Sequence, residues 1–160
     1  MRVAPSTAYD ARELATFLRA SDRAELAENA RRLGTVKFPC DLVQESFRKS
    51  LSWTLWRGDD VVGMGGASES PKPGIGIIWF LGTDLADTHW RDMTRACRAV
   101  MRMEHERFPI LMNVAPPGSD ARLRWLSHLG FDIGKTEANG PLNGYVAFWS
   151  RRCCTAPTGD

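Results

Sequence analysis

The chain has 160 residues, of which 43% are hydrophobic and 25% are charged, and its formal net charge is +2. These are the fractions of an ordinary globular protein, and a single domain of this length can bury about 70% of its extended-chain surface. The charge is too mild to predict a nucleic-acid-binding protein, and no stretch has the roughly 20 apolar residues that a membrane-spanning helix needs. The four cysteines lack disulfide-scaffold density and Cys-x-x-Cys spacing, which favours a reducing, cytoplasmic setting.

The first part of the chain predicts one edge strand and three helices. Residues 1–4 form the strand, which Pro5 ends. Helices are predicted over 10–19 and 41–49, where apolar residues recur at helical spacing. Between them, a helix begins at the capping residue Ser21 and ends at Gly34. The apolar side of the first helix is formed by Leu14, Phe17 and Leu18.

An antiparallel meander is predicted next. Residues 52–56 alternate like a half-buried strand, 57–60 have the composition of a hairpin turn, and 61–67 return as the partner strand. A second turn over 68–73 leads into residues 74–82, the longest apolar run of the chain. A run of this length predicts a strand buried on both faces.

The apolar strand continues through a polar turn into a long helix that ends near Phe108. The turn over 83–88 offers two helix caps, Asp87 and Thr88. From His89 onward, apolar residues recur every three to four positions, which predicts one buried helical face. The members of that face are Trp90, Met93, Cys97, Val100 and Met101. A strand that feeds a helix through a short turn often holds a phosphate-bearing ligand in α/β proteins.

The last third of the chain predicts a strand, a helix and a hairpin. Residues 109–114 form a strand that pairs in parallel with the apolar strand before the long helix. A helix begins at Ser119 or Asp120 and ends at Gly130. Two final strands, over 131–135 and 145–149, surround an Asn139-Gly140 turn. Residues 1–152 are therefore predicted to form one domain, followed by a loosely ordered polar tail over 153–160.

This order of elements resembles the GNAT acetyltransferase fold over nearly the whole chain. The most specific local match is the segment 125–131, which is similar to the Leu-Gly-Phe step with which these enzymes pass from a helix into the next strand. The resemblance implies an α/β (α+β) GNAT-like acyl-CoA N-acyltransferase fold, in which helices flank a central, mostly antiparallel mixed sheet. It also implies acetyl-CoA as cofactor and transfer of an acetyl group to an amine.

A narrower resemblance is to internal virion protein A of short-tailed phages, a family that looks like a diverged GNAT fold. The similar segments are 78–84, 113–114, 124–126 and 129–131. This resemblance implies that the chain acts as an internal virion or virion-assembly protein. Its partners would then be virion or assembly proteins, and its location the host cytoplasm or the virion.

Two features of ordinary GNAT enzymes are missing from the sequence. Those enzymes hold the cofactor pyrophosphate with an Arg/Gln-x-x-Gly-x-Gly/Ala turn, whose glycines let backbone N–H groups reach the phosphates. The corresponding turn, 82–89, has one glycine and two carboxylates, Asp84 and Asp87, which repel phosphate. The tyrosine that often precedes the Leu-Gly-Phe step and protonates the departing thiolate is Leu126 here. If acetyl-CoA binds, the residues expected to hold it are Leu81, Gly82, Thr83, Thr88, His89 and Arg91.

Three polar residues are candidates for a catalytic base or a ligand contact. Glu69 follows the third strand, Asp84 lies at the end of the apolar strand, and Asn113 lies near the end of the strand that follows. Asp84 and Asn113 would face the gap between those two strands if the strands splay. For each of them, a role as a turn, cap or solvated residue is the stronger explanation. The three histidines have no mutual spacing suited to a metal, so no metal site is predicted.

The sequence therefore leaves three hypotheses of function. The first is a phage GNAT-like virion or assembly protein without an efficient active site. The second is an acetyl-CoA-dependent N-acetyltransferase that acts on an amine of a small molecule or protein. The third is an inhibitor that binds a host protein through exposed tryptophans, since aromatic residues are favoured at interface centres. A measurement of coenzyme A binding separates the second hypothesis from the others.

Overall fold

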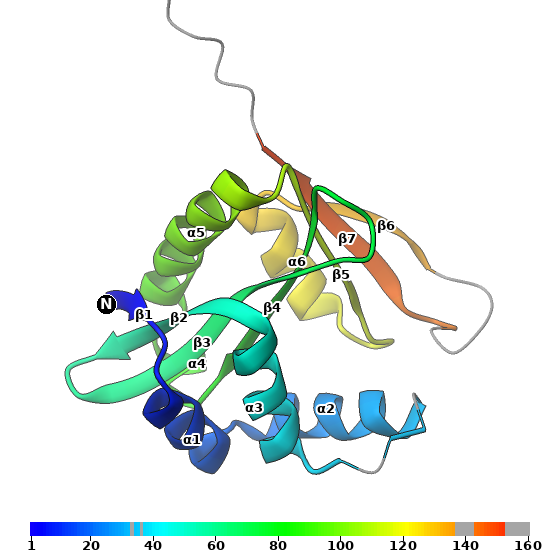
Figure 1. Ribbon diagram of the computed structural model, residues 1–160. Helices are drawn as coiled ribbons and strands as arrows, with labels where there is room; N and C mark the ends of the chain where they lie inside the picture. Colours follow the sequence, from blue (N-terminus) through cyan, green and yellow to red (C-terminus); the bar gives the residue numbers. More distant parts are fainter. Residues whose placement is uncertain (33, 36, 137–142, 153–160) are drawn as a thin grey trace, which may run out of the picture.

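The fold is built on one seven-stranded mixed sheet in the order β1-β2-β3-β4-β5-β7-β6 (Figure 1). The computed structural model describes residues 1–32, 34, 35, 37–136 and 143–152. All neighbouring strands are antiparallel except β4 and β5, which are parallel. The strands are β1 (Arg2–Pro5), β2 (Ser50–Arg57), β3 (Asp60–Glu69), β4 (Ile75–Gly82), β5 (Ile110–Ala115), β6 (Asp132–Thr136) and β7 (Val146–Arg151).

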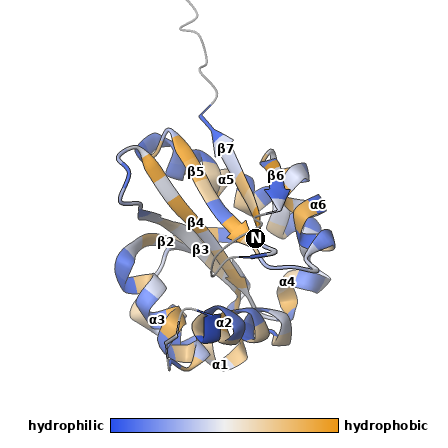
Figure 2. Ribbon diagram, turned by 90° about the vertical axis from the view of Figure 1, so that its right-hand side faces the viewer, coloured by the Kyte–Doolittle hydropathy of each residue, from blue (hydrophilic) through white to orange (hydrophobic). Residues whose placement is uncertain are grey.

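Helices cover both faces of the sheet. α1, α2 and α3 gather at one end of the molecule, whereas α5 and α6 lie together on the other side (Figures 1 and 2). Their bounds are α1 (Ala8–Phe17), α2 (Ala20–Arg32), α3 (Pro39–Lys49), α4 (Leu85–Thr88), α5 (Trp90–Arg107) and α6 (Asp120–Leu129). A capping box between Thr7 and Asp10 begins α1, and Gly130, with φ 102°, ends α6 in the left-handed conformation that glycine adopts readily. In the part of the chain that the structure describes, no helix is both long and apolar enough to cross a membrane.

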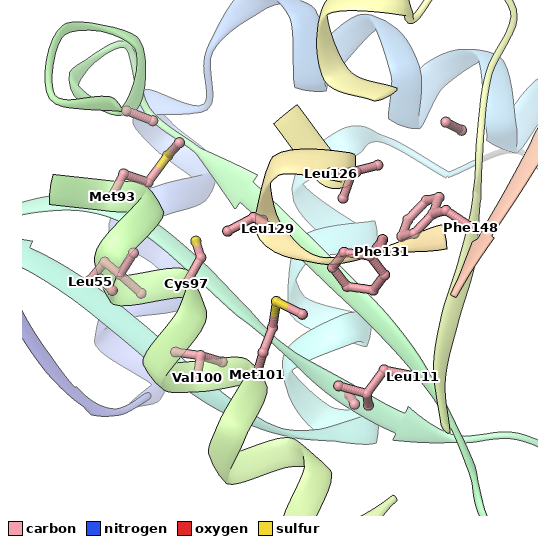
Figure 3. Packing of buried hydrophobic residues seen from close by; sticks show 14 of the residues in the cluster. Leu55, Met93, Cys97, Val100, Met101, Leu111, Leu126, Leu129, Phe131 and Phe148 are labelled. Carbon is pink, nitrogen blue, oxygen red and sulfur yellow. The ribbon is translucent and has the colours of Figure 1, made fainter. Parts of the chain in front are cut away.

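Two apolar clusters hold these layers together. The larger one joins the sheet to α5 and α6, and Figure 3 shows Met93, Cys97 and Met101 of α5 facing Leu126 and Leu129 of α6. The smaller one joins the other face of the sheet to α1 and α3 and is formed by Ala11, Leu14, Leu18, Val43, Val61, Met64 and Leu81. The side chains of β4 alternate between the two clusters, so this strand is packed from both sides.

The two parallel strands separate along their length. Pairing between β4 and β5 is limited to three positions and ends at Ile77 and Met112. Beyond that point β4 stays paired with β3 as far as Gly82, while β5 stays paired with β7 as far as Ala115. The predicted parallel pairing is confirmed, and the sheet opens into a gap at the carboxyl ends of these strands.

Several local predictions were wrong. Neither Asp87 nor Thr88 caps the long helix: they lie in the short helix α4, and His89 is the N-cap residue of α5. Trp90 is 49% exposed, because the first turn of α5 extends past the core. Phe17 is likewise exposed, and β4 is half-buried because one edge borders the gap. The predicted Asn139-Gly140 turn and the predicted tail over 153–160 lie outside the described residues.

Substitution of Leu111 by alanine tests the larger cluster. Leu111 is fully buried in β5, next to the last parallel pairs. We expect Leu111→Ala to lower the free energy of unfolding by about 2–5 kcal/mol, since it removes buried methyl groups and leaves a cavity. Urea denaturation measures this loss. Leu51→Ala, at a half-exposed strand position, is the control and should cost less than about 1 kcal/mol; equal losses at both positions would contradict the assigned core.

Candidate active-site cleft

A cleft of about 590 Å³ opens where β4 and β5 separate. It is lined from both faces of β4, because Ile78 and Phe80 point to the α5–α6 side while Trp79 and Leu81 point to the α1–α3 side. The opposite wall is formed by Asn113 and further residues of β5, β7 and α6. The cleft therefore reaches from one face of the sheet to the other, and its volume is typical of a small-molecule site.

The gap leaves part of the β4 backbone without a strand partner. Thr83 N–H donates to Val62 O of β3 at 2.9 Å, and in an antiparallel ladder alternate residues face alternate sides. The N–H and C=O groups of Phe80 consequently face β5, beyond the last pair at Ile77 and Met112. Phe80 thus presents a backbone N–H donor and a C=O acceptor to the cleft.

Asn113 bridges the start of the gap. Its Nδ2 donates to Ile78 O at 2.6 Å, and its Oδ1 accepts from Val114 N–H at 2.8 Å. The side chain therefore takes the place of the next ladder bond and satisfies a carbonyl that β5 no longer reaches. Of the three candidate catalytic residues, Asn113 is the one that lines the cleft.

The remaining walls of the cleft are largely aromatic. Phe80 and Trp125 lie with their ring centroids 6.2 Å apart, and Trp125 Nε1 donates to Thr94 Oγ1 of α5 at 2.9 Å. Trp79 is held by a bond from its Nε1 to Ser50 Oγ at 3.1 Å. Because each indole N–H has a partner within the protein, these rings form a fixed apolar wall for an extended ligand.

A network of ion pairs crosses the mouth of the cleft. Asp22 of α2 accepts from Gly82 N–H at 2.7 Å and from Arg19 Nε at 2.9 Å, and it lies 3.4 Å from Arg122 Nη2 of α6. Arg19 also pairs with Asp87 at 2.6 Å, and Arg122 with Glu25. The network joins α2, β4, α4 and α6 around the open end of the gap.

The two arginines of this network differ in their electrostatics. Burial acts to lower the pKa of the Arg19 guanidinium, but its bonds to Asp22 and Asp87 outweigh burial and raise that pKa. Burial also lowers the pKa of Arg122, and here the charge of Asp22 does not offset it. Arg122 is therefore the cation with more to gain from an additional anion.

The turn before α5 uses most of its N–H groups internally. Bonds within the turn or to β3 take the N–H groups of Thr83, Ala86, Asp87, Thr88 and His89. Within α5, the first backbone N–H that donates to a carbonyl of the preceding turn is that of Met93, which donates to His89 O at 3.0 Å. A phosphate at this position would therefore meet the first three N–H groups of α5, those of residues 90–92, instead of a glycine-rich loop.

The other two candidate catalytic residues lie apart from the cleft. Asp84 borders a separate cavity of about 410 Å³ together with Glu13 and Asp60. Glu69 is exposed at the end of β3, where it is paired with Gly76 at the opposite end of β4. The structure thus brings neither carboxylate to Asn113, and their catalytic role stays a prediction without geometric support.

The six residues expected to hold a cofactor are also separated. Leu81 lines the cleft, whereas Gly82 gives its N–H to Asp22. The hydroxyl groups of Thr83 and Thr88 donate to backbone carbonyls, of Val61 and Val62 for the first and of Leu85 for the second. The His89 ring contacts Arg57, and Arg91 lies over the Trp90 ring with its Cζ 5.3 Å from the centroid. Among them, Leu81 is the one that lines the cleft.

Sequence reasoning missed the charged residues at the mouth of the cleft. The one local signal that Asp22 carries is its place as an acidic residue in the first turn of a helix. Its contacts with Gly82 and Arg122 join residues 60 and 100 positions apart, and no local pattern encodes them.

The described residues do not favour a metal site or a cysteine nucleophile at the cleft. Within the described residues, no group of three or more His, Cys, Asp or Glu side chains is placed to hold a metal ion. Burial raises the pKa of the Cys97 thiol to about 12, so this thiol is not a nucleophile at neutral pH.

Substitution of Asn113 tests its role at the start of the gap. In Asn113→Ala, Ile78 O and Val114 N–H lose their side-chain partner, and the free energy of unfolding should fall by about 1–3 kcal/mol. Asn143→Ala is the control for the same chemical change at an exposed position. Denaturant titration of both variants supplies the comparison, and equal stability of Asn113→Ala and wild type would argue against the bridge.

Solved structures of acetyltransferases share this architecture. The chain is similar to aminoglycoside 6'-acetyltransferase type Ii, with a TM-score of 0.72 and 12% identity over 94% of this chain and 97% of that one. It is similar to the GNAT domain of PAT from S. lividans, with a TM-score of 0.61 and 14% identity over 94% and 89% of the two chains. A Bacillus subtilis acetyltransferase in complex with CoA gives a TM-score of 0.62 at 12% identity over 94% and 97%.

Comparisons by sequence give no further relative. No family model and no curated protein matches the chain, so the resemblance to internal virion proteins rests on short motifs alone. The predicted fold class is confirmed by the structural neighbours and by the mixed sheet with its helical layers. The chain has the fold of the GNAT acetyltransferases.

Proposed function

We propose that the chain is an acetyl-CoA-dependent N-acyltransferase that acts on an amine. The observation that carries the proposal is the opened gap between β4 and β5, in which the N–H and C=O groups of Phe80 face a cleft that reaches both faces of the sheet. A ligand arm that contains amide groups can extend the β4 edge through these two groups, as an added strand does. The CoA-bound acetyltransferases among the structural neighbours support the same choice of cofactor.

The residues of the cleft fit the arm of such a cofactor. Bound acetyl-CoA supplies an activated thioester. The aromatic wall of Phe80, Trp125 and Phe148 excludes water from that region, and Phe80 N–H and C=O orient the arm along β4. The fit at the phosphates is weaker, since the N–H groups of residues 90–92 are what the turn before α5 offers there.

The opposite face of the cleft suits an acceptor. Ser46 of α3 and Asn29 of α2 line the cleft on the side where α1–α3 lie. An acceptor bound there approaches the gap from the face opposite α5 and α6, so the two reactants meet across the sheet. Because Leu126 cannot donate a proton, the site favours acceptor amines that arrive already deprotonated.

The hypothesis that the chain is a virion or assembly protein is a second proposal. One observation favours it: the turn before α5 uses its N–H groups internally and carries carboxylates, as expected of a GNAT-like domain that has no need of a pyrophosphate. Its partners would be virion or assembly proteins, or a host protein. The third hypothesis, docking through exposed tryptophans, has one residue in its favour, because Trp90 is the exposed tryptophan among the described residues.

Calorimetry with acetyl-CoA tests the first proposal. We expect binding with a dissociation constant below about 1 mM, which corresponds to roughly −4 kcal/mol. Ala121→Trp should weaken binding at least tenfold, because Ala121 lines the cleft at an exposed position where a large side chain fills the entry without disturbing the core. Ser127→Trp is the control on the same helix, exposed and outside the cleft.

Two outcomes would contradict the acyltransferase proposal. One is the absence of any binding heat at millimolar acetyl-CoA. The other is an equal loss of affinity in Ala121→Trp and Ser127→Trp, which would place the cofactor elsewhere. If acetyl-CoA does not bind, mass spectrometry of particles from a phage lysate decides whether the virion proposal takes its place.

A further inference from the structure

Helix α2 is attached to the rest of the fold mainly by polar contacts. Asp22, Glu25, Asn29 and Arg32 follow each other at spacings of three, four and three residues, which places them on one face of the helix. Asp22 contacts Gly82 and Arg122, and Glu25 also contacts Arg122. Asn29 accepts a hydrogen bond from the Tyr145 hydroxyl at 2.5 Å, and Arg32 donates one to Asn143 O at 3.1 Å. The buried residues of α2 are Asp22 and Ala30 alone, and Figure 2 shows α2 as a largely hydrophilic helix.

This mode of attachment makes α2 easier to displace than its neighbours. A hydrogen bond inside a protein replaces one to water, so its net contribution is only about 0.5–1.5 kcal/mol. α5, in contrast, buries seven residues, five of them in the larger apolar cluster. Elements with few buried apolar contacts open at a lower free energy than core elements.

The carboxylate of Asp22 occupies a point where three donors converge. Its side chain is 2% exposed, and the donors come from different segments: Gly82 N–H from the end of β4, Arg19 from the residue before α2, and Arg122 from α6. Two guanidinium groups and a backbone N–H are what proteins use to bind phosphates and carboxylates. Without Asp22, these donors would form a vacant oxyanion site at the edge of the cleft.

The charges of the network show that Asp22 is replaceable by another anion. Arg19 has a second partner in Asp87, and Arg122 has one in Glu25. These two pairs are neutral by themselves, so Asp22 is the one carboxylate in excess of the two arginines. An external phosphate in its place would carry at least the negative charge that Asp22 supplies, and it would also compensate Arg122, whose pKa burial has lowered.

We propose that Arg19, Arg122 and Gly82 N–H form a phosphate-binding site, which Asp22 occupies in the free protein and vacates when α2 moves off the cleft. Helix α2 thus carries an internal competitor for the anionic part of the ligand. The site replaces the phosphate contacts that the turn before α5 does not supply. It rests on the proposed function only for the identity of the natural ligand, since inorganic pyrophosphate can probe the site by itself.

Calorimetry with pyrophosphate, CoA and phosphate-free pantetheine tests the site. Asp22→Asn keeps an oxygen acceptor for Gly82 N–H but removes the charge, so it should tighten binding of pyrophosphate and CoA at least tenfold and leave that of pantetheine within twofold. Asp87→Asn is the matched control, because that carboxylate also pairs with Arg19 but is 67% exposed and screened by solvent. It should change pyrophosphate binding less than threefold. The double variant Asp22→Asn/Arg122→Gln should lose the gain.

Equal gains in Asp22→Asn and Asp87→Asn, or no gain in Asp22→Asn, would overturn the proposal. Hydrogen exchange on the unaltered protein provides a second test that does not depend on a variant folding. Saturating pyrophosphate should speed exchange of α2 amides at residues 22–32 and leave α5 unchanged; unchanged α2 exchange in the bound protein would also overturn it. A tighter pyrophosphate site without CoA binding would instead reject the proposed function and keep this site.

Discussion

The early end of pairing between β4 and β5 is the constraint on which the rest of the structure depends. A sheet that opens exposes backbone groups, and buried groups of this kind must find partners or face a cavity. Asn113 satisfies the first of them, Ile78 O, and Asp22 satisfies the last, Gly82 N–H. The N–H and C=O groups of Phe80 lie between them on the same edge. Along this edge of β4, some backbone groups have side-chain hydrogen-bond partners and others have none among the described residues. The groups without a partner are the ones that the cleft offers to a ligand.

The same opening explains why helices from distant parts of the chain meet at one place. α2 comes before the sheet in sequence and α6 comes near its end, yet Asp22 and Arg122 meet at the mouth of the gap. Apolar packing fixes α5 and α6 against the sheet, whereas α2 is attached mainly through its polar face, with Leu26 packed against the smaller cluster. The cleft therefore has rigid walls and one side that is held by charge. This division of stability suits a site that must admit a ligand, because the walls persist when the polar side moves.

The architecture could be read from the sequence because it is encoded in local patterns. The meander over residues 50–69, the apolar run of β4 and the helical period of α5 each lie in one continuous segment, and Gly130 marks the end of α6. The parallel pairing followed from the strand–helix–strand order. The wrong predictions concern the exposure of Phe17 and Trp90, the burial of β4 and the cap of α5. For Phe17 and Trp90 the helical pattern was correct, but the extent of the neighbouring core decided exposure. Periodicity predicts a face of a helix, and tertiary packing determines how much of that face is covered.

By itself, the sequence determined the order and type of the elements other than the short helix α4, the GNAT-like fold and the absence of a glycine-rich phosphate turn. It also placed Asn113 near the end of a strand, where an opening would expose it. Only the tertiary structure decided that the strands do open, that Asp84 and Glu69 lie away from the cleft, and that Asp22 lies between two arginines. The physical reason is the range of the contacts: the tendency of a segment to form a strand, a helix or a cap is set by residues a few positions apart. The cleft arises from contacts that join residues 60 and 100 positions apart, and their geometry exists only once the sheet has formed.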